Sequence, residues 1–305
     1  MSRVTTYGNN QSALLNLMTA QKRTSEAQNR FSTGKNATDL VGFGREAATV
    51  NALKSTQMRV MSHIDTNKAV ADRLSAQDLA MGQIADAATA SRLAIANAIA
   101  SGRMDGLMEE LKIQFQTISD ALNTEHQGQF LFSGGISNTK PSAVANLDEL
   151  GAVATVDDAF ANGYLRQASR LDDNVVMDTG FLASELGSEL FQIFSDLKAM
   201  DGTTPLKGPI DGAMNTTLTT LMQRFEGAAK NVINEQGLNG IYQKRVEDII
   251  TSNSVKSDTL EIMLSDKTDA DMAKAITDLE LAQVALQASA QVVSQLRQVS
   301  LLDYL

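Results

Sequence analysis

The chain has 305 residues, 43% of them hydrophobic, and no cysteine. The absence of cysteine excludes disulfides, zinc–thiolate sites and thiol nucleophiles, and it suits a protein that meets an oxidising exterior. The formal net charge of −10 at pH 7 argues against nucleic acid as a partner, because phosphate binding requires clustered lysine and arginine.

Neither a membrane-spanning segment nor a signal peptide is expected. No stretch approaches the roughly 18 consecutive apolar residues that a spanning helix needs. Near the N-terminus, polar residues at positions 9–12 interrupt the place where the apolar core of a signal peptide would run. We therefore expect no membrane insertion, and export of this chain would need another route.

Two apolar runs of helical spacing occupy residues 46–127. The first repeats at multiples of seven: Leu53, Val60, Leu74, Met81, Ala88 and Ile95. The second alternates steps of four and three: Met104, Met108, Leu111, Phe115, Ile118 and Leu122. Both patterns predict helices whose single apolar seam packs against partner helices, as in a coiled coil.

Two glycines, Gly102 and Gly106, separate these runs. Each costs roughly 1 kcal/mol inside a helix, so a break is predicted there. A continuous helix over residues 46–100 would measure about 80 Å at a rise of about 1.5 Å per residue. That length is incompatible with a compact sphere, and we predict a mainly α protein built as an elongated coiled-coil rod.

The middle of the chain has a different character. From Ser133 to about Gly180 the helical period fades, and glycine, asparagine, aspartate, serine and threonine accumulate. Short segments at residues 152–156 and 174–177 are predicted to be strands, which makes this region a small β-containing insertion.

Helical patterning resumes after the insertion. It covers residues 186–197, gives way to a linker at residues 201–209 that holds two of the three prolines, and continues over residues 212–263. A break is predicted near residues 265–267. Thr268 is predicted to cap a last helix that runs to residue 302, with Asp271 in its acidic first turn.

Both ends of the chain are amphipathic but nearly without charge. Arg3 is the only charged residue in positions 1–21, and Arg297 is the only one in positions 281–302. A helix with a solvent-facing side normally carries charge there. We therefore expect these helices to be covered by protein on all sides and to become ordered on assembly. Pairing of the two ends within one monomer is the alternative.

The residues offer little for catalysis. The chain has two histidines, His63 and His126, and neither has an acidic or histidine partner at helical spacing that would form a metal-ligand pattern. No motif for a nucleophile and its base surrounds either of them. The sequence predicts no enzyme, no catalytic residues, no cofactor and no metal site.

Four segments resemble the bacterial flagellin family. Residues 30–35 (RFSTGK) resemble the segment that closes the family's first helix, and residues 39–45 (DLVGFGR) resemble the loop that follows. Residues 240–247 (GIYQKRVE) resemble the family's Gly-x-x-Gln-x-Arg-Leu-Glu stretch. Residues 268–279 (TDADMAKAITDL), followed by Gln287-Ala288, resemble the Asp-Ala-Asp segment of the last helix.

Two segments resemble the hook–filament junction branch of this family, whose members are hook-associated proteins. They are residues 128–134 (GQFLFSG) and the ending at residues 300–305 (SLLDYL). Thr38–Val41 departs from the Ser-Asp-Asp-Pro loop common in that branch, so a flagellin of the filament itself remains the alternative. An intracellular coiled-coil scaffold is a more remote alternative.

The resemblance implies three regions. Residues 1–45 and 265–305 would form an inner tube of terminal helices, residues 46–136 and 181–264 a helical rod, and residues 137–180 a surface insertion. It also implies export through the flagellar type III apparatus to the exterior, and a chaperone on the C-terminal helix. The subunits would self-associate in a ring between a hook-side hook-associated protein and flagellin.

Assembly contacts are expected from apolar residues of the two ends. The candidate interface residues are Leu14, Leu17, Met18, Leu286, Val293 and Leu296.

Overall fold

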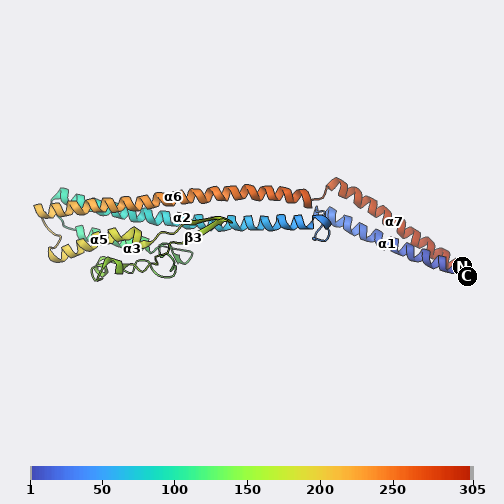
Figure 1. Cartoon of the computed structure of the whole chain (residues 1–305), viewed down its shortest axis with the longest axis horizontal. Coiled ribbons are helices and arrows are strands. Elements are labelled where there is room, and N and C mark those ends of the chain that lie inside the picture. The colour runs from blue at the N-terminus through green and yellow to red at the C-terminus, as the bar shows by residue number, and fades with distance from the viewer. Residues whose placement is uncertain (1, 303–305) are drawn as a thin grey trace. The chain divides into compact units, whose positions relative to one another are not determined.

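The computed structural model describes residues 2–302, and over this range the chain is mainly α-helical with two small two-stranded sheets (Figure 1). The predicted fold class is therefore confirmed. The helices are α1 (Ser2–Thr33), α2 (Ala47–Ser101), α3 (Leu107–Leu122), α4 (Leu147–Leu150), α5 (Ala183–Thr203), α6 (Gly212–Thr268) and α7 (Met272–Leu302). The strands are β1 (Glu125–His126), β2 (Gln129–Phe130), β3 (Ala168–Asp172) and β4 (Val175–Asp178), and two short 3-10 helices are η1 (Gly44–Glu46) and η2 (Val156–Ala159).

None of the helices in the described range combines the length and the apolar character that crossing a membrane requires.

The chain divides into two compact units. The terminal unit contains the residues up to Met61 and those from Ser254 onward, and the internal unit is Ser62–Asn253. The division into three regions that the sequence suggested remains a prediction.

The predicted break after α2 is confirmed. Gly102 and Gly106 both adopt positive φ, of +68° and +83°, a conformation that residues with a β-carbon rarely take. The broken segment is held by the linker before α6, because Met104 N–H donates to the Gly208 carbonyl (2.9 Å) and Ile210 N–H donates to the Gly102 carbonyl (2.9 Å). The glycines therefore let the chain turn from α2 into α3 beside that linker.

The internal unit has one main hydrophobic core, to which α2, α3, α5 and α6 contribute. Every residue of the second predicted apolar run is buried in this core, and so are the last three of the first run, Met81, Ala88 and Ile95. The other members of the first run lie elsewhere: Leu74 is in a smaller core, and in the terminal unit Val60 is buried and Leu53 is half-buried. Phenylalanines fill the centre: Phe115 lies 4.9 Å from Phe191 and 5.2 Å from Phe194 between ring centroids. Helical periodicity thus identified the core faces correctly.

A smaller core lies where the β3–β4 hairpin packs against α2 and α6. Leu171 of β3 is buried with Val70 and Leu74 of α2 and Val246 of α6. Side chains of α6 also reach the backbone of α2, since Asn239 Nδ2 donates to the Leu74 carbonyl at 2.8 Å. These contacts seat the hairpin on the two long helices (Figure 1).

The insertion was predicted in part. Residues 174–177 correspond to β4, but the strand predicted at residues 152–156 was wrong. Local side-chain bonds begin the two short helices on either side of this segment. Asn146 Oδ1 accepts from Glu149 N–H at the start of α4, and Asp158 accepts from the backbone N–H and hydroxyl of Thr155 at the start of η2. Such local bonds compete with strand pairing.

The predicted break before the last helix is present, but it lies at residues 269–271, slightly later than the expected 265–267. Helix α6 continues to Thr268, and Asp271, not Thr268, caps α7, with its Oδ1 accepting from Ala273 N–H at 2.9 Å and from Lys274 N–H at 3.2 Å. The Thr268 carbonyl instead accepts from Asn36 N–H at 2.7 Å. This tertiary contact sets the end of α6 in a way that helix propensity does not reveal.

Replacing Phe115 by alanine should lower the free energy of unfolding by about 3–5 kcal/mol, because it leaves a cavity between two other phenylalanine rings. Urea titration followed by circular dichroism measures the change. The matched control is Ile113→Ala on the same helix, whose side chain is 62% exposed and whose loss should cost less than about 0.5 kcal/mol. Equal effects of the two substitutions would contradict the assignment of this core.

Candidate assembly interface

Helices α1 and α7 lie side by side in antiparallel orientation (Figure 1). Their contact is made by small residues: Ala13, Ala20 and Ala27 of α1 are buried at intervals of seven. Thr24 Oγ1 donates to the Ala282 carbonyl of α7 at 3.1 Å as well as to the Ala20 carbonyl of its own helix at 2.9 Å. Small side chains at this spacing allow the two backbones to approach closely along one seam.

The end of this helix pair is fastened by backbone hydrogen bonds. Asn36 N–H donates to the Thr268 carbonyl at 2.7 Å, and Ala270 N–H donates to the Gly34 carbonyl at 2.8 Å. The Lys35 ammonium binds the Asp269 carboxylate in the same crossing. The residues that follow α1 therefore pair in register with those that precede α7.

Outside the seam, α1 and α7 expose apolar residues without neighbouring charge. Residues 4–21 and 281–296 contain no aspartate, glutamate, lysine or arginine. Met18 is 65% exposed and Val284 is 63% exposed. Extended apolar surface of this kind is rare on monomeric soluble proteins and is typical of interaction sites. The pairing of the two ends within one chain, which the sequence left as an alternative, therefore occurs but leaves outer faces uncovered.

Two grooves run along the α1–α7 pair. One of about 580 Å³ is lined by residues from Asn16 to Arg30 of α1 and from Asp278 to Ser289 of α7. The other, of about 400 Å³, lies nearer the start of α1 and has Val292 and Leu296 in its wall. Both are open depressions that a side chain or helix of another molecule can enter.

The six candidate interface residues fall into two groups. Leu14 and Met18 are exposed, whereas Leu17, Leu286, Val293 and Leu296 are half-buried. The sequence analysis missed the more exposed apolar residues, which share the outer surface with Leu14 and Met18: Leu15, Leu281, Val284 and Val292. A stricter selection of residues opposite the alanine seam would have found several of them. The role of all these residues in assembly remains a prediction.

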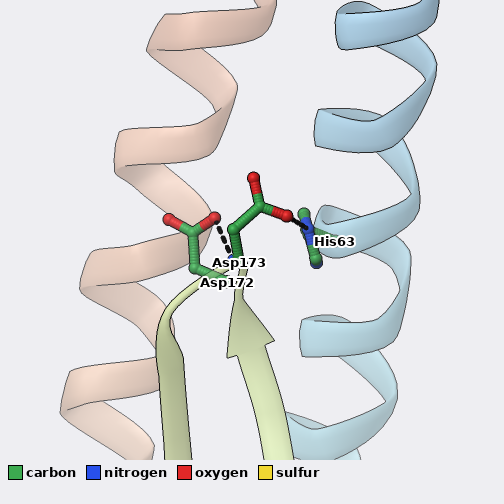
Figure 2. A group of neighbouring side chains, drawn as sticks. All are labelled: His63, Asp172 and Asp173. Carbon is green, nitrogen blue, oxygen red and sulfur yellow. Dashed lines mark hydrogen bonds and ion pairs between the residues drawn. The ribbon is translucent and has the colours of Figure 1, made fainter.

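The two histidines occupy different settings in the internal unit. His126 lies in β1, and its Nε2 is buried with no hydrogen-bond partner among the described residues. His63 Nε2 lies 3.3 Å from Asp173 Oδ1, and Asp172 lies beside this pair (Figure 2). The ligand atoms of these three side chains all lie within 4.8 Å of one another, which is close enough for ligands of one metal ion. Sequence analysis missed this group because the two aspartates are more than a hundred positions away from the histidine.

The contact between Lys35 and Asp269 makes this end of the helix pair sensitive to acid. Hydrogen bonds from Lys35, Ser265 and Thr268 lower the pKa of Asp269 from an ordinary value of 3.8 to about 2. Because the pKa is lower in the folded chain, the stabilisation is fully present above about pH 4 and is lost as the pH falls through 2.

NMR titration of the Asp269 carboxyl carbon should therefore show a midpoint near 2, and Lys35→Met should move it upward. Lys22→Met, which removes an exposed lysine elsewhere on α1, is the control and should leave the midpoint unchanged. A midpoint near 3.8 in the unaltered chain would refute the contact.

Comparisons with known proteins give family matches at both ends of the chain and solved structures of similar fold. No curated protein sequence matches the chain. Among solved structures, a flagellar hook-associated protein from Vibrio parahaemolyticus is similar with a TM-score of 0.61 and 13% identity, covering 73% of this chain and 97% of that one. FlgL from Bacillus cereus is similar with a TM-score of 0.54 and 15% identity, covering 70% of this chain and 98% of that one.

Family profiles cover most of the sequence. Residues 4–137 match the bacterial flagellin N-terminal helical region, and residues 222–305 match the bacterial flagellin C-terminal helical region. The two regions occur in the expected order and together span well over half of the chain. The chain belongs to the bacterial flagellin family of flagellar structural proteins.

Proposed function

We propose that this chain is the subunit that joins the flagellar hook to the filament, acting by helix packing and not by catalysis. The observation that supports this most directly is the α1–α7 pair, whose outer faces carry exposed apolar residues and no charge over residues 8–21 and 281–296. Burying such faces against neighbouring subunits is the main favourable contribution to association.

Two further observations favour the junction over the filament. The similar solved structures bear the descriptions flagellar hook-associated protein and FlgL. The junction-like segment at residues 128–134 also has a definite place in this fold, because Leu131 and Phe132 are buried and the Phe132 carbonyl accepts from Ala183 N–H at 3.0 Å. This segment follows α3 in the chain and is held by this hydrogen bond to the first residue of α5. The other junction-like segment, residues 300–305, lies outside the residues whose side chains the structure describes.

The proposed partners follow from this role. Copies of the chain would associate in a ring, with a hook-side hook-associated protein on one face and flagellin on the other. Export would use the flagellar type III apparatus, with a chaperone covering the C-terminal helix until assembly. A chaperone suits α7, since its exposed apolar residues would otherwise promote aggregation.

The decisive experiment adds purified chain to bare hooks and to short filament seeds and follows both by electron microscopy. A junction subunit should bind hook ends carrying the hook-side protein, stop after a short layer, and then permit growth by added flagellin. Continuous elongation of the seeds by this chain alone would make it a filament flagellin. Binding to neither structure would contradict a role in the axial assembly.

A charge on the outer face of α7 should block this assembly. Val284→Glu places a carboxylate on a surface that is exposed in the single chain, so the fold should be unchanged while burial of the charge against a neighbour becomes costly. We expect no detectable layer on hooks by electron microscopy, with unaltered circular dichroism. Val293→Glu tests a half-buried candidate in the same assay.

Val284→Thr is the matched control, since threonine has nearly the shape of valine and carries no charge. It should retain most of the binding to hooks. Normal assembly by the glutamate variant would show that this face of α7 is not an interface.

A further inference from the structure

Three polar residues of α2 hold the β3–β4 hairpin. They are His63 and Asn67, one helical turn apart, and Arg73 further along the helix, and each of them contacts the hairpin or a residue next to it. Asn67 Nδ2 donates to the Leu171 carbonyl at 2.8 Å, and Arg73 donates to Gln167 Oε1 at 2.5 Å and to Ser169 Oγ at 3.1 Å. The tip of the hairpin is therefore fixed at the level of His63.

The turn at this tip is itself constrained. The pairing of β3 with β4 is irregular between Arg170 and Asp172. Arg170 donates to the main-chain carbonyls of Asp172 (3.4 Å) and Asp173. Asp173 N–H donates to Asp172 Oδ1 at 2.8 Å. These bonds place two consecutive carboxylates beside one imidazole (Figure 2).

We propose that His63, Asp172 and Asp173 form a site for a divalent transition-metal ion such as Zn²⁺. One nitrogen and two carboxylate oxygens are a ligand set that zinc accepts, with water in a fourth position.

The distances support this assignment. The three ligand atoms lie within 4.8 Å of one another. In a tetrahedral site with bonds of about 2.0 Å, neighbouring ligand atoms are about 3.3 Å apart. His63 Nε2 and Asp173 Oδ1 already have a separation of 3.3 Å, which is the separation expected of two ligands of one ion.

The surroundings add a second observation. Asn67 lies one helical turn from His63 and faces the hairpin, as its bond to Leu171 shows. It is fully buried, and its Oδ1 has no donor among the described residues. Buried acceptors are normally satisfied by protein or ordered water, and water bound to the ion would place a donor on this face of the helix. The His63 side chain is 18% exposed, which leaves a path for the ion to enter.

The ligand set also predicts selectivity. Calcium and magnesium prefer sites made entirely of oxygen, whereas imidazole favours zinc, copper, nickel and related ions. The site should therefore bind Zn²⁺ in the presence of a large excess of Mg²⁺, which occupies the many weak carboxylate sites of an acidic chain.

The experiment uses the full chain and the fact that it contains only two histidines. Zinc is added in excess Mg²⁺, and the two imidazole rings are followed by NMR while calorimetry measures affinity. The His63 ring should shift with one equivalent of zinc, and the His126 ring should not. Absence of zinc binding, or equal shifts of both rings, would overturn the proposal and leave His63 and Asp173 as a hydrogen-bonded pair.

Substitutions identify the ligands. His63→Gln and Asp173→Asn should each weaken zinc binding by more than the roughly tenfold loss that removal of an outer-shell partner causes. His126→Gln is the matched control and should bind zinc normally. Circular dichroism checks that each variant is folded, and Asp172→Asn, which keeps the histidine pair intact, provides an independent arm if His63→Gln unfolds. Unchanged affinity in the folded ligand variants would refute the site.

Discussion

The terminal unit depends on a close contact between alanines. Ala13, Ala20 and Ala27 allow α1 to lie directly against α7, and they are the buried residues in the part of α1 whose side chains are described. Because the outer faces carry apolar residues and no charge over residues 8–21 and 281–296, water solvates them poorly. The same helices that hold the ends together therefore present a surface suited to other helices.

The internal unit is stabilised differently. Its main core is filled by phenylalanine and leucine side chains of α2, α3, α5 and α6, and it needs no neighbour to bury them. The β3–β4 hairpin contributes Leu171 to the smaller core, with Val175 and Met177 packed against it. Polar bonds from Asn67 and Arg73 of α2 add to these apolar contacts. The internal unit thus buries the apolar side chains of its core within one chain, whereas the terminal unit leaves apolar faces that further protein can cover.

Much of this fold was predictable because apolar residues on the buried face of a helix recur with the helical period. The run from Met104 to Leu122 is buried at every predicted position, and the glycine break before it follows from conformational cost. The failures come from hydrogen bonds that the helical period does not reveal, one set of them tertiary and the other local. The end of α6 is set by Asn36, which lies far away in sequence, and the segment at residues 152–156 is governed by local caps. The group of His63 with Asp172 and Asp173 was unpredictable for the same reason, since no pattern links positions separated by 110 residues.

The antiparallel pairing of α1 with α7 also determines when in folding the terminal unit can form. Thr24 bonds to Ala282, a partner 258 positions later in the chain, so α1 has nothing to pack against until almost the whole polypeptide is available. Contacts of such long range form late and slowly in folding. The internal unit, whose helices are nearer in sequence, can form its core first. A chain emerging with its N-terminus leading would carry α1 unpaired throughout, and a chain shortened by its last helix would never close its terminal unit.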